Sequence, residues 1–227
     1  MRTHPTLEHG RHPERAVSDM AVIHDILDSQ LTCHVAITVD GWPYALPTVH
    51  ARDGGRLLIH GSTLSRMLGG LAEGIPACVT VTAVEGIVAA RSAFHHSVNY
   101  RSAMVFGTAT PIRERSDKMA ALRVIVEHVL PGRWSEVREP SVTELRATEI
   151  VSIPLDRTTA KVREGGPADA PADLKHRVWS GVIPIETRLL TPILVPADVA
   201  ALALPGSVVA AMERRSARRG AVHSDGE

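Results

Sequence analysis

Short alternating segments separated by Asp-Gly turns are the feature that most constrains the fold of this chain. Residues 32–39 alternate apolar and polar side chains, the pattern of a half-buried strand. Asp40-Gly41 follows, residues 44–52 return, and a second turn at residues 53–55 leads into residues 56–60. Asp-Gly between alternating segments favours a tight hairpin. The chain therefore begins as an antiparallel meander.

Proline at position 47 limits how the second strand of this meander can pair. Pro47 lies inside the second segment and has no N–H to donate to a neighbouring strand. Its presence favours an edge or a bulge, where backbone groups stay free for a ligand.

The rest of the chain continues in the same style. Helices are predicted at residues 18–30 and 116–129, and strands at residues 77–84, 86–90, 100–110, 148–155 and 158–162, the last two as a pair. Strands in meander order with helices inserted at turns predict a mainly β fold, an antiparallel barrel or curled sheet.

Length and composition place this fold in one core domain. The chain has 227 residues and is 44% hydrophobic, enough to bury a real core. We expect a flexible N-terminal arm (residues 1–15), a barrel domain (16–188), and a C-terminal helical extension with a disordered tail (189–227). Lys plus Arg and Asp plus Glu both number 25, so no bulk charge points to nucleic acid.

The sequence also indicates in which cellular compartment the protein is expected. The N-terminal residues contain no apolar segment typical of a secretory signal. The apolar run at residues 189–212 is interrupted by prolines and an aspartate, whereas a membrane span needs about 20 mostly uninterrupted apolar residues. Cys33 and Cys78 lie in strand-like runs, which favours buried thiols in a reducing compartment. These features predict a cytoplasmic protein with no membrane partner.

A candidate anion site lies between the third strand and the next helical pattern. Gly61, Ser62, Ser65 and Arg66 occupy this junction. A helix N-terminus offers unpaired N–H groups and a partial positive charge, so these residues could hold a phosphate. The alternative is a simple N-cap by Ser62 with a solvated Arg66.

The densest cluster of polar side chains lies at residues 91–107, RSAFHHSVNYRSAMVFG. From Tyr100 onward the side chains alternate as in a strand, and the start of this strand is polar. The chain has 12 histidines, but no zinc-type spacing, so no metal site is predicted. A single axial histidine leaves no spacing signature, so haem ligation stays open for the histidines of the strands and of this cluster, which are His50, His60, His95 and His96.

Several of these segments resemble a known family. HGSTLSRML, RSAFHHSVNYRSAMVFG, PGRWSEVREPSVTEL, AKVREG and VWSGVIP occur in this order. Together they resemble the flavin-nucleotide-binding proteins of the pyridoxamine 5′-phosphate oxidase-like superfamily, in the branch of the nitroimidazole-resistance reductases. The resemblance covers roughly residues 14–184. It implies an antiparallel split β-barrel that binds FMN, and a homodimer with two equivalent FMN sites between its subunits.

The resemblance also implies roles for single residues. The flavin ring would lie along the second strand, beside Pro47, Thr48, Val49 and His50. The ribityl chain would pass His60 and Gly61, and the phosphate would meet Ser62, Ser65 and Arg66. Ser102 would bond the flavin, and Trp179 would close over the ring from the partner subunit. His60 occupies the position of a reactive histidine in relatives, which makes it the candidate catalytic residue.

The resemblance implies an FMN-dependent oxidoreductase acting on a small molecule. The arginine and lysine pattern of true pyridoxamine phosphate oxidases is replaced by ALPTVH, so the substrate need not be vitamin B6. Two alternatives remain open, a non-catalytic flavin or haem carrier or sensor, and a reductase that uses deazaflavin.

Overall fold

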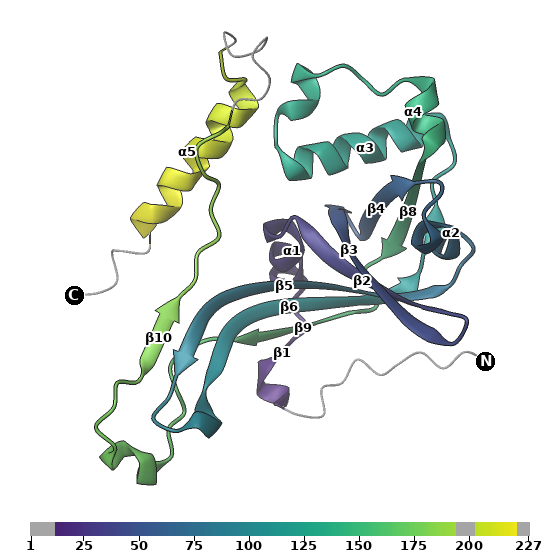
Figure 1. Cartoon of the computed structure of the whole chain (residues 1–227). Coiled ribbons are helices and arrows are strands. Elements are labelled where there is room, and N and C mark those ends of the chain that lie inside the picture. The colour runs from purple at the N-terminus through teal and green to yellow at the C-terminus, as the bar shows by residue number, and fades with distance from the viewer. Residues whose placement is uncertain (1–11, 194–202, 222–227) are drawn as a thin grey trace.

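The computed structural model describes residues 12–193 and 203–221, and its dominant element is one antiparallel sheet (Figure 1). The sheet has 10 strands in the order β1-β9-β6-β5-β2-β3-β4-β8-β7, and β10 pairs with β5 outside this path. It bends strongly without closing, so the fold is a split β-barrel, as the sequence predicted.

The strands run in a meander with helices between them. The strands are β1 (Ala16–Val17), β2 (Thr32–Val39), β3 (Trp42–Asp53), β4 (Arg56–Ser62), β5 (Pro76–Ala89), β6 (Ser97–Thr108), β7 (Thr110–Pro111), β8 (Thr148–Pro154), β9 (Thr158–Arg163) and β10 (Gly181–Pro184). The α-helices are α1 (Met20–Ser29), α2 (Arg66–Ala72), α3 (Arg115–Val129), α4 (Val142–Ala147) and α5 (Gly206–Ala221). Short 3-10 turns are η1 (Pro13–Arg15), η2 (Ala93–His95), η3 (Arg133–Glu136) and η4 (Pro171–Lys175).

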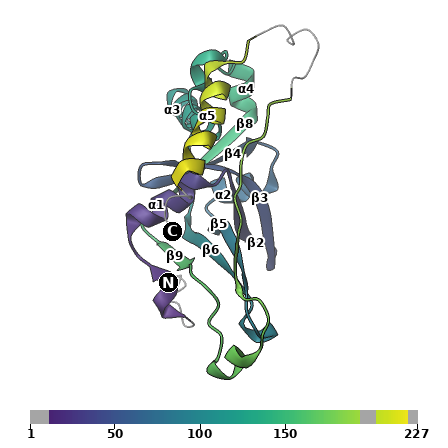
Figure 2. The same ribbon diagram turned by 90° about the vertical axis from the view of Figure 1, so that its left-hand side faces the viewer.

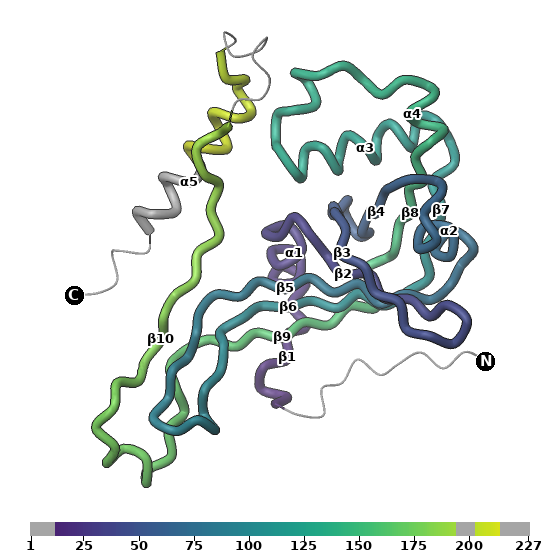
Figure 3. Tube along the Cα trace, viewed as in Figure 1, coloured from purple at the N-terminus to yellow at the C-terminus, as the bar shows by residue number. Residues whose placement is uncertain are grey.

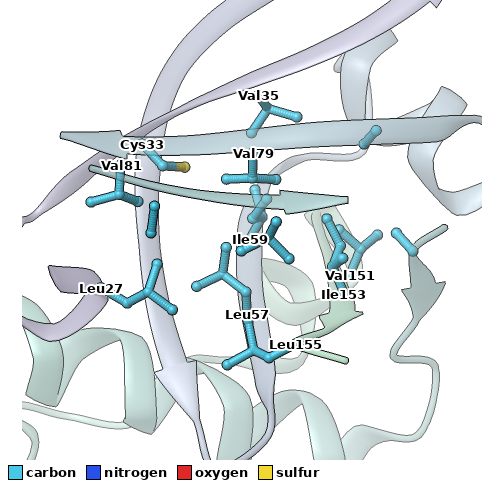
Figure 4. Packing of buried hydrophobic residues seen from close by; sticks show 14 of the residues in the cluster. Leu27, Cys33, Val35, Leu57, Ile59, Val79, Val81, Val151, Ile153 and Leu155 are labelled. Atoms are coloured by element: carbon cyan, nitrogen blue, oxygen red, sulfur yellow. The ribbon is translucent and has the colours of Figure 1, made fainter. Parts of the chain in front are cut away.

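The main core lies on the concave side of the sheet (Figure 4). Strand alternation turns Val35, Val79 and Val105 inward, and all three are fully buried. Ile26 and Leu27 of α1 close this side. Burying one such side chain stabilises the fold by about 1.5–3 kcal/mol, so the apolar phase of these strands fixes which face is inside.

A smaller core forms where α3 covers β3, β4 and β8. Ala121 and Ile125 of the helix pack against Ala51, Leu58 and Ile150. The strands β4 and β8 are therefore covered on both faces, which gives β4 its continuous run of buried residues.

The predicted elements are confirmed, with one correction to a strand boundary and one to strand pairing. α1 begins where predicted, with Asp19 accepting a hydrogen bond from the Ala21 amide at 2.8 Å. Residues 77–84 and 86–90 are one strand, because a bulge between Val84 and Gly86 bends β5 without ending it. The predicted pair at residues 148–155 and 158–162 is wrong, since β8 pairs with β4 and β9 pairs with β6.

The far end of the β5–β6 hairpin extends away from α2 and α3, together with β10 and η4 (Figures 1 and 3). We call residues 86–98 the distal hairpin. Beyond β10 the chain runs along one side of the sheet towards α5, as the view in Figure 2 shows. Ser207 ties α5 to η3 through two hydrogen bonds to the Glu136 carboxylate.

The ends of the chain are described in part. Of the predicted N-terminal arm, residues 1–11 lie outside the described residues and Pro13–Arg15 form η1. Of the predicted C-terminal tail, residues 222–227 lie outside them. Among the described helices, none is long and apolar enough to cross a membrane.

Candidate functional site

The strands β3 and β4 separate a short distance from the turn that joins them. They pair from Asp53 and Arg56 as far as His50 and Ile59. Beyond this point, within the described chain, residues 42–49 pair only with β2 and residues 60–62 pair only with β8. Both strands therefore present an unpaired backbone edge, and we call the place where they part the fork.

Pro47 lies at the fork. It pairs with His34 of β2 on one side, and no strand of the described chain pairs with it on the other. The predicted edge position is therefore confirmed. Thr48 and Val49 follow it with half-buried side chains, and their backbone groups on the open side are available to a polar ligand.

Gly61 allows β4 to approach α2 closely. A Cβ atom at this position would lie 2.8 Å from Cδ1 of Leu68, closer than a real Cβ contact. Only glycine therefore fits without a shift of the Leu68 side chain. The first turn of α2 lies directly against the open end of β4.

The hydroxyls beyond Gly61 organise the loop into α2. The Oγ of Ser62 accepts a hydrogen bond from the Leu64 amide at 3.1 Å. Ser65 is the N-cap and accepts from the Leu68 amide at 3.4 Å, so the cap considered at Ser62 is wrong. Each hydroxyl uses its oxygen as a local acceptor, which leaves its O–H as a donor for an anion.

Arg66 is the cation of this loop. It is the first residue of α2, it is exposed, and it forms no ion pair among the described residues. An exposed guanidinium that follows two serines in the same short loop can bind a phosphate through charge-assisted hydrogen bonds. The structure thus brings Ser62, Ser65 and Arg66 together at one end of the fork.

His60 lies on β4 at the fork, where its ring is half-buried. Its Nδ1 atom is buried and has no hydrogen-bond partner. Burial lowers the pKa of His60 below its ordinary value, so the imidazole is neutral at pH 7. A neutral ring beside an open strand edge can accept a proton or a hydrogen bond.

His50 is different, because its side chain belongs to the core. The ring has no exposed surface, and its Nε2 donates to the Leu27 carbonyl of α1 at 2.9 Å. Burial lowers the pKa of His50 to about 4. His128 packs against it with ring centroids 5.3 Å apart and donates to the Gln30 carbonyl. The His50 side chain is therefore structural, and only its backbone faces the fork.

Ser102 lies on the outer face of the sheet and away from the fork. It pairs with Thr82 of β5 and Lys161 of β9, and its half-buried side chain points opposite to the buried Ala103. The strands β5 and β2 stand between β6 and β3, which corresponds to roughly 14 Å at the usual strand spacing. One chain does not bring Ser102 to the fork.

Trp179 lies still further away, at the base of β10, and 65% of its surface is exposed. A Cβ atom on Gly181 would lie 3.0 Å from Cζ2 of the Trp179 ring, so the indole rests on the Gly181 backbone. The predicted site residues therefore form three groups, at the fork, on the outer face and beside the distal hairpin.

Sequence reasoning missed the residue that fastens the linker before Trp179. Asp169 pairs with Arg91 at the start of the distal hairpin, and its side chain is only 4% exposed. Nothing local marks this pair, since the two residues are 78 positions apart. The available signal was an isolated aspartate in a linker of glycine, alanine and proline.

Among the residues that the structure describes, no group of three or more His, Cys, Asp or Glu side chains is placed so that it could hold a metal ion.

Comparison with known proteins identifies the family. The family model described as pyridoxamine 5′-phosphate oxidase matches residues 19–162. The chain belongs to the pyridoxamine 5′-phosphate oxidase family. This agrees with the split-barrel sheet and confirms the family that the sequence motifs resemble. Curated protein sequences give no match.

Two solved structures of this family are similar over almost the whole chain. The FAD and heme binding protein from Mycobacterium smegmatis is 38% identical, with a TM-score of 0.84, over 87% of this chain and 97% of that one. The flavocytochrome Anf3 from Azotobacter vinelandii is 32% identical, with a TM-score of 0.84, over 89% of this chain and 94% of that one.

A third structure shows the fold alone. It is that of a candidate 5-nitroimidazole antibiotic resistance protein from Bacteroides thetaiotaomicron, 23% identical with a TM-score of 0.56. The match covers 65% of this chain and 86% of that one.

Proposed function

We propose that this chain is a flavoprotein that binds a flavin nucleotide at the fork and acts as an oxidoreductase on a small molecule. The observation that carries the proposal is the meeting of two unpaired strand edges with Ser62, Ser65 and Arg66. A flavin combines a flat ring with polar edge groups and a phosphate at the end of a ribityl chain. The strand edges suit the ring, and the loop suits the phosphate.

Each group at the fork has a role in this proposal. The backbone of Pro47, Thr48, Val49 and His50 reads the edge of the ring. His60 and Gly61 flank the ribityl chain. The bound flavin would supply hydride or electron transfer, while the protein positions it and limits water access. His60 is neutral at pH 7 and is the proposed catalytic proton acceptor.

The form of the flavin is part of the proposal. FMN is the cofactor that the sequence predicted, and the name of the 38% identical relative supports FAD. Both carry the phosphate that the loop would hold. We propose FAD, and identification of the flavin released from the purified protein by denaturation distinguishes the two.

A homodimer is the proposed assembly. Ser102 and Trp179 lie far from the fork in one chain, so a second copy would have to bring them to the flavin. The outer face of the sheet offers a surface for this contact, because Cys78, Met104 and Phe106 are only half-buried there. A molar mass measured by light scattering that equals one chain would contradict the dimer.

A haem is the second proposed cofactor. The two solved structures at 38% and 32% identity are named for FAD and haem binding and as a flavocytochrome. Haem iron needs as few as one protein ligand, so the lack of a metal cluster in the described chain does not bear on it. With haem present, the chain would move electrons between flavin and haem.

An absorbance spectrum of the purified protein tests both cofactors. We expect flavin bands that disappear on reduction, a Soret band if haem is bound, and quenching of flavin fluorescence on titration with FAD. Protein that stays colourless and gives no response to FAD or FMN would contradict the flavin proposal. Tight flavin binding without turnover of NADH, NADPH or reduced deazaflavin would favour a carrier or sensor over an enzyme.

A further inference from the structure

His96, at the start of β6, has one ring nitrogen committed and the other free. Its Nδ1 lies 2.9 Å from the carbonyl oxygen of Ser92, and the side chain is exposed. A carbonyl oxygen only accepts, so Nδ1 carries the proton of the neutral ring. The lone pair is therefore on Nε2. Histidines that ligate metals are commonly fixed in this way, with the second nitrogen donating to a carbonyl.

The same face of the distal hairpin carries a row of exposed aliphatic side chains. Ile87 pairs with Val98 on one side and with Ile183 of β10 on the other. Their exposed fractions are 44%, 41% and 50%. Directly paired residues share a face of the sheet and lie about 5 Å apart, so the row is continuous. Scattered single apolar residues are common on surfaces, but a row across three strands is a patch.

Next to this aliphatic row lies a second row, formed by the pair Ala89 and Gly181, with His96 at one end and Trp179 at the other. His96 lies two residues before Val98 on extended backbone, so alternation places it on the same face. Gly181 shares this face with Ile183, and the Trp179 ring rests on the Gly181 side of it. Ala89 pairs with Gly181 between them. A flat apolar floor is therefore bordered by an indole at one end and an imidazole at the other.

Other histidines considered for haem are less suited. His50 is fully buried and its Nε2 is used by Leu27. His60 lies at the fork, where the flavin is proposed. His95 packs edge-to-face on Phe94 with ring centroids 5.1 Å apart, and no carbonyl of the described residues accepts a hydrogen bond from its ring. Of the four, only His96 combines exposure, a fixed tautomer and an apolar surface beside it.

We propose that the distal hairpin and β10 form a haem site in which Nε2 of His96 is the axial ligand. The apolar floor of Ile87, Val98 and Ile183 would contact the macrocycle, whose iron accepts one imidazole from the protein. This inference rests on the haem part of the proposed function. The flavin at the fork does not depend on it.

Titration of the full-length protein with haemin tests the site. We expect a Soret band typical of histidine ligation that saturates at one haem per chain. His96→Ala should weaken haemin affinity by roughly tenfold or more, and added imidazole should restore the spectrum by supplying the missing ligand. His95→Ala is the matched control, since it removes the adjacent imidazole and should leave the Soret band unchanged.

Flavin binding is measured on the same samples so that the two proposals fail separately. Both variants should bind FAD as the unaltered protein does. Loss of the Soret band in His95→Ala with retention in His96→Ala overturns the assignment, and so does retention in both. Flavin binding with no haemin binding by the unaltered protein overturns the haem site and leaves the flavin proposal intact. Ile87→Glu should also weaken haemin binding, and an unchanged affinity contradicts the apolar floor.

Discussion

The carboxylate of Asp169 accepts two hydrogen bonds from Arg91, from its backbone amide at 2.8 Å and from its guanidinium at 2.6 Å. The pair fastens the linker after β9 to the start of the distal hairpin. The Arg91 amide holds the pKa of Asp169 below its ordinary value, and the guanidinium adds to this effect. The linker leads directly to Trp179 and β10, so the pair also positions the indole.

Removal of this carboxylate should loosen the linker while leaving the barrel folded. In Asp169→Ala, we expect faster proteolytic cleavage between residues 164 and 180 and a red-shifted tryptophan emission, because the indole would lose its fixed place. Asp173→Ala is a control in the same linker, since Asp173 lies in η4 and its side chain forms no ion pair with the described residues. Equal cleavage rates in the two variants would show that Asp169 does not hold the linker.

The buried His50 predicts a loss of stability in mild acid. Its pKa is about 4 in the folded state and near 6.5 in the unfolded chain. Between these values the unfolded chain binds the extra proton, so the free energy of unfolding falls as pH drops from 6.5 to 4 and is flat above that window. The shift corresponds to a loss on the order of 3 kcal/mol.

Substitution of the ring tests this pH dependence. His50→Gln can still donate to the Leu27 carbonyl but does not titrate, so its stability should fall less steeply between pH 6.5 and 4. Denaturant unfolding at a series of pH values measures the slope. Burial also lowers the pKa of His60, so a residual slope of the same sign should remain. Identical slopes in both proteins would contradict the role of His50.

The proposed contact between Arg66 and the flavin phosphate predicts how much FAD affinity depends on this side chain. One charge-assisted hydrogen bond contributes about 1.5–3 kcal/mol, so Arg66→Ala should weaken FAD binding by roughly 10- to 100-fold. Arg56→Ala is the matched control, because Arg56 is exposed on the same strand–loop unit but pairs with Asp53 at the β3–β4 turn. Fluorescence titration gives both affinities. An unchanged affinity in Arg66→Ala would place the phosphate elsewhere.

Local features of the sequence predicted the elements, and long-range contacts decided what they join. Alternation in residues 32–39 and 100–106 is visible within a few positions, and both segments are strands. The pairing of β8 with β4 and of β9 with β6 depends on residues that are far apart in the chain. Pairing of β8 with β9, which follow one another in the chain, was the simplest prediction. Each strand instead pairs with a distant strand of the barrel.

In the candidate site, too, local features were predictable from the sequence and long-range contacts were not. The loop at residues 61–66 was visible because glycine, hydroxyl residues and arginine lie within six positions of one another. The burial of His50 was not, since it arises from α1 and from His128, which reaches the same helix end from α3. Likewise, nothing in the sequence shows that Trp179 rests on Gly181, or that Ile87, Val98 and Ile183 form one row. These relationships exist only once the strands have paired.

The contact of β4 with α2 gives a last prediction, on Gly61. A methyl group there would lie 2.8 Å from Cδ1 of Leu68, so Gly61→Ala must displace the Leu68 side chain, which belongs to α2. We expect a loss of about 1–3 kcal/mol in unfolding free energy, as for other overpacked contacts, because Leu68 is buried and has little room to shift. FAD binding should weaken to the extent that α2 moves with Leu68 and carries Ser65 and Arg66 with it.

The double variant Gly61→Ala with Leu68→Ala separates these two effects. Removing the Leu68 side chain relieves the clash, so α2 can return and FAD affinity should recover relative to Gly61→Ala. Stability should stay low, because Leu68 is 2% exposed and its truncation leaves a cavity. Gly55→Ala is the control, since a Cβ atom there meets nothing within 4 Å. Flavin affinity that stays low in the double variant would show that Gly61 acts on the ligand directly and not through the position of α2.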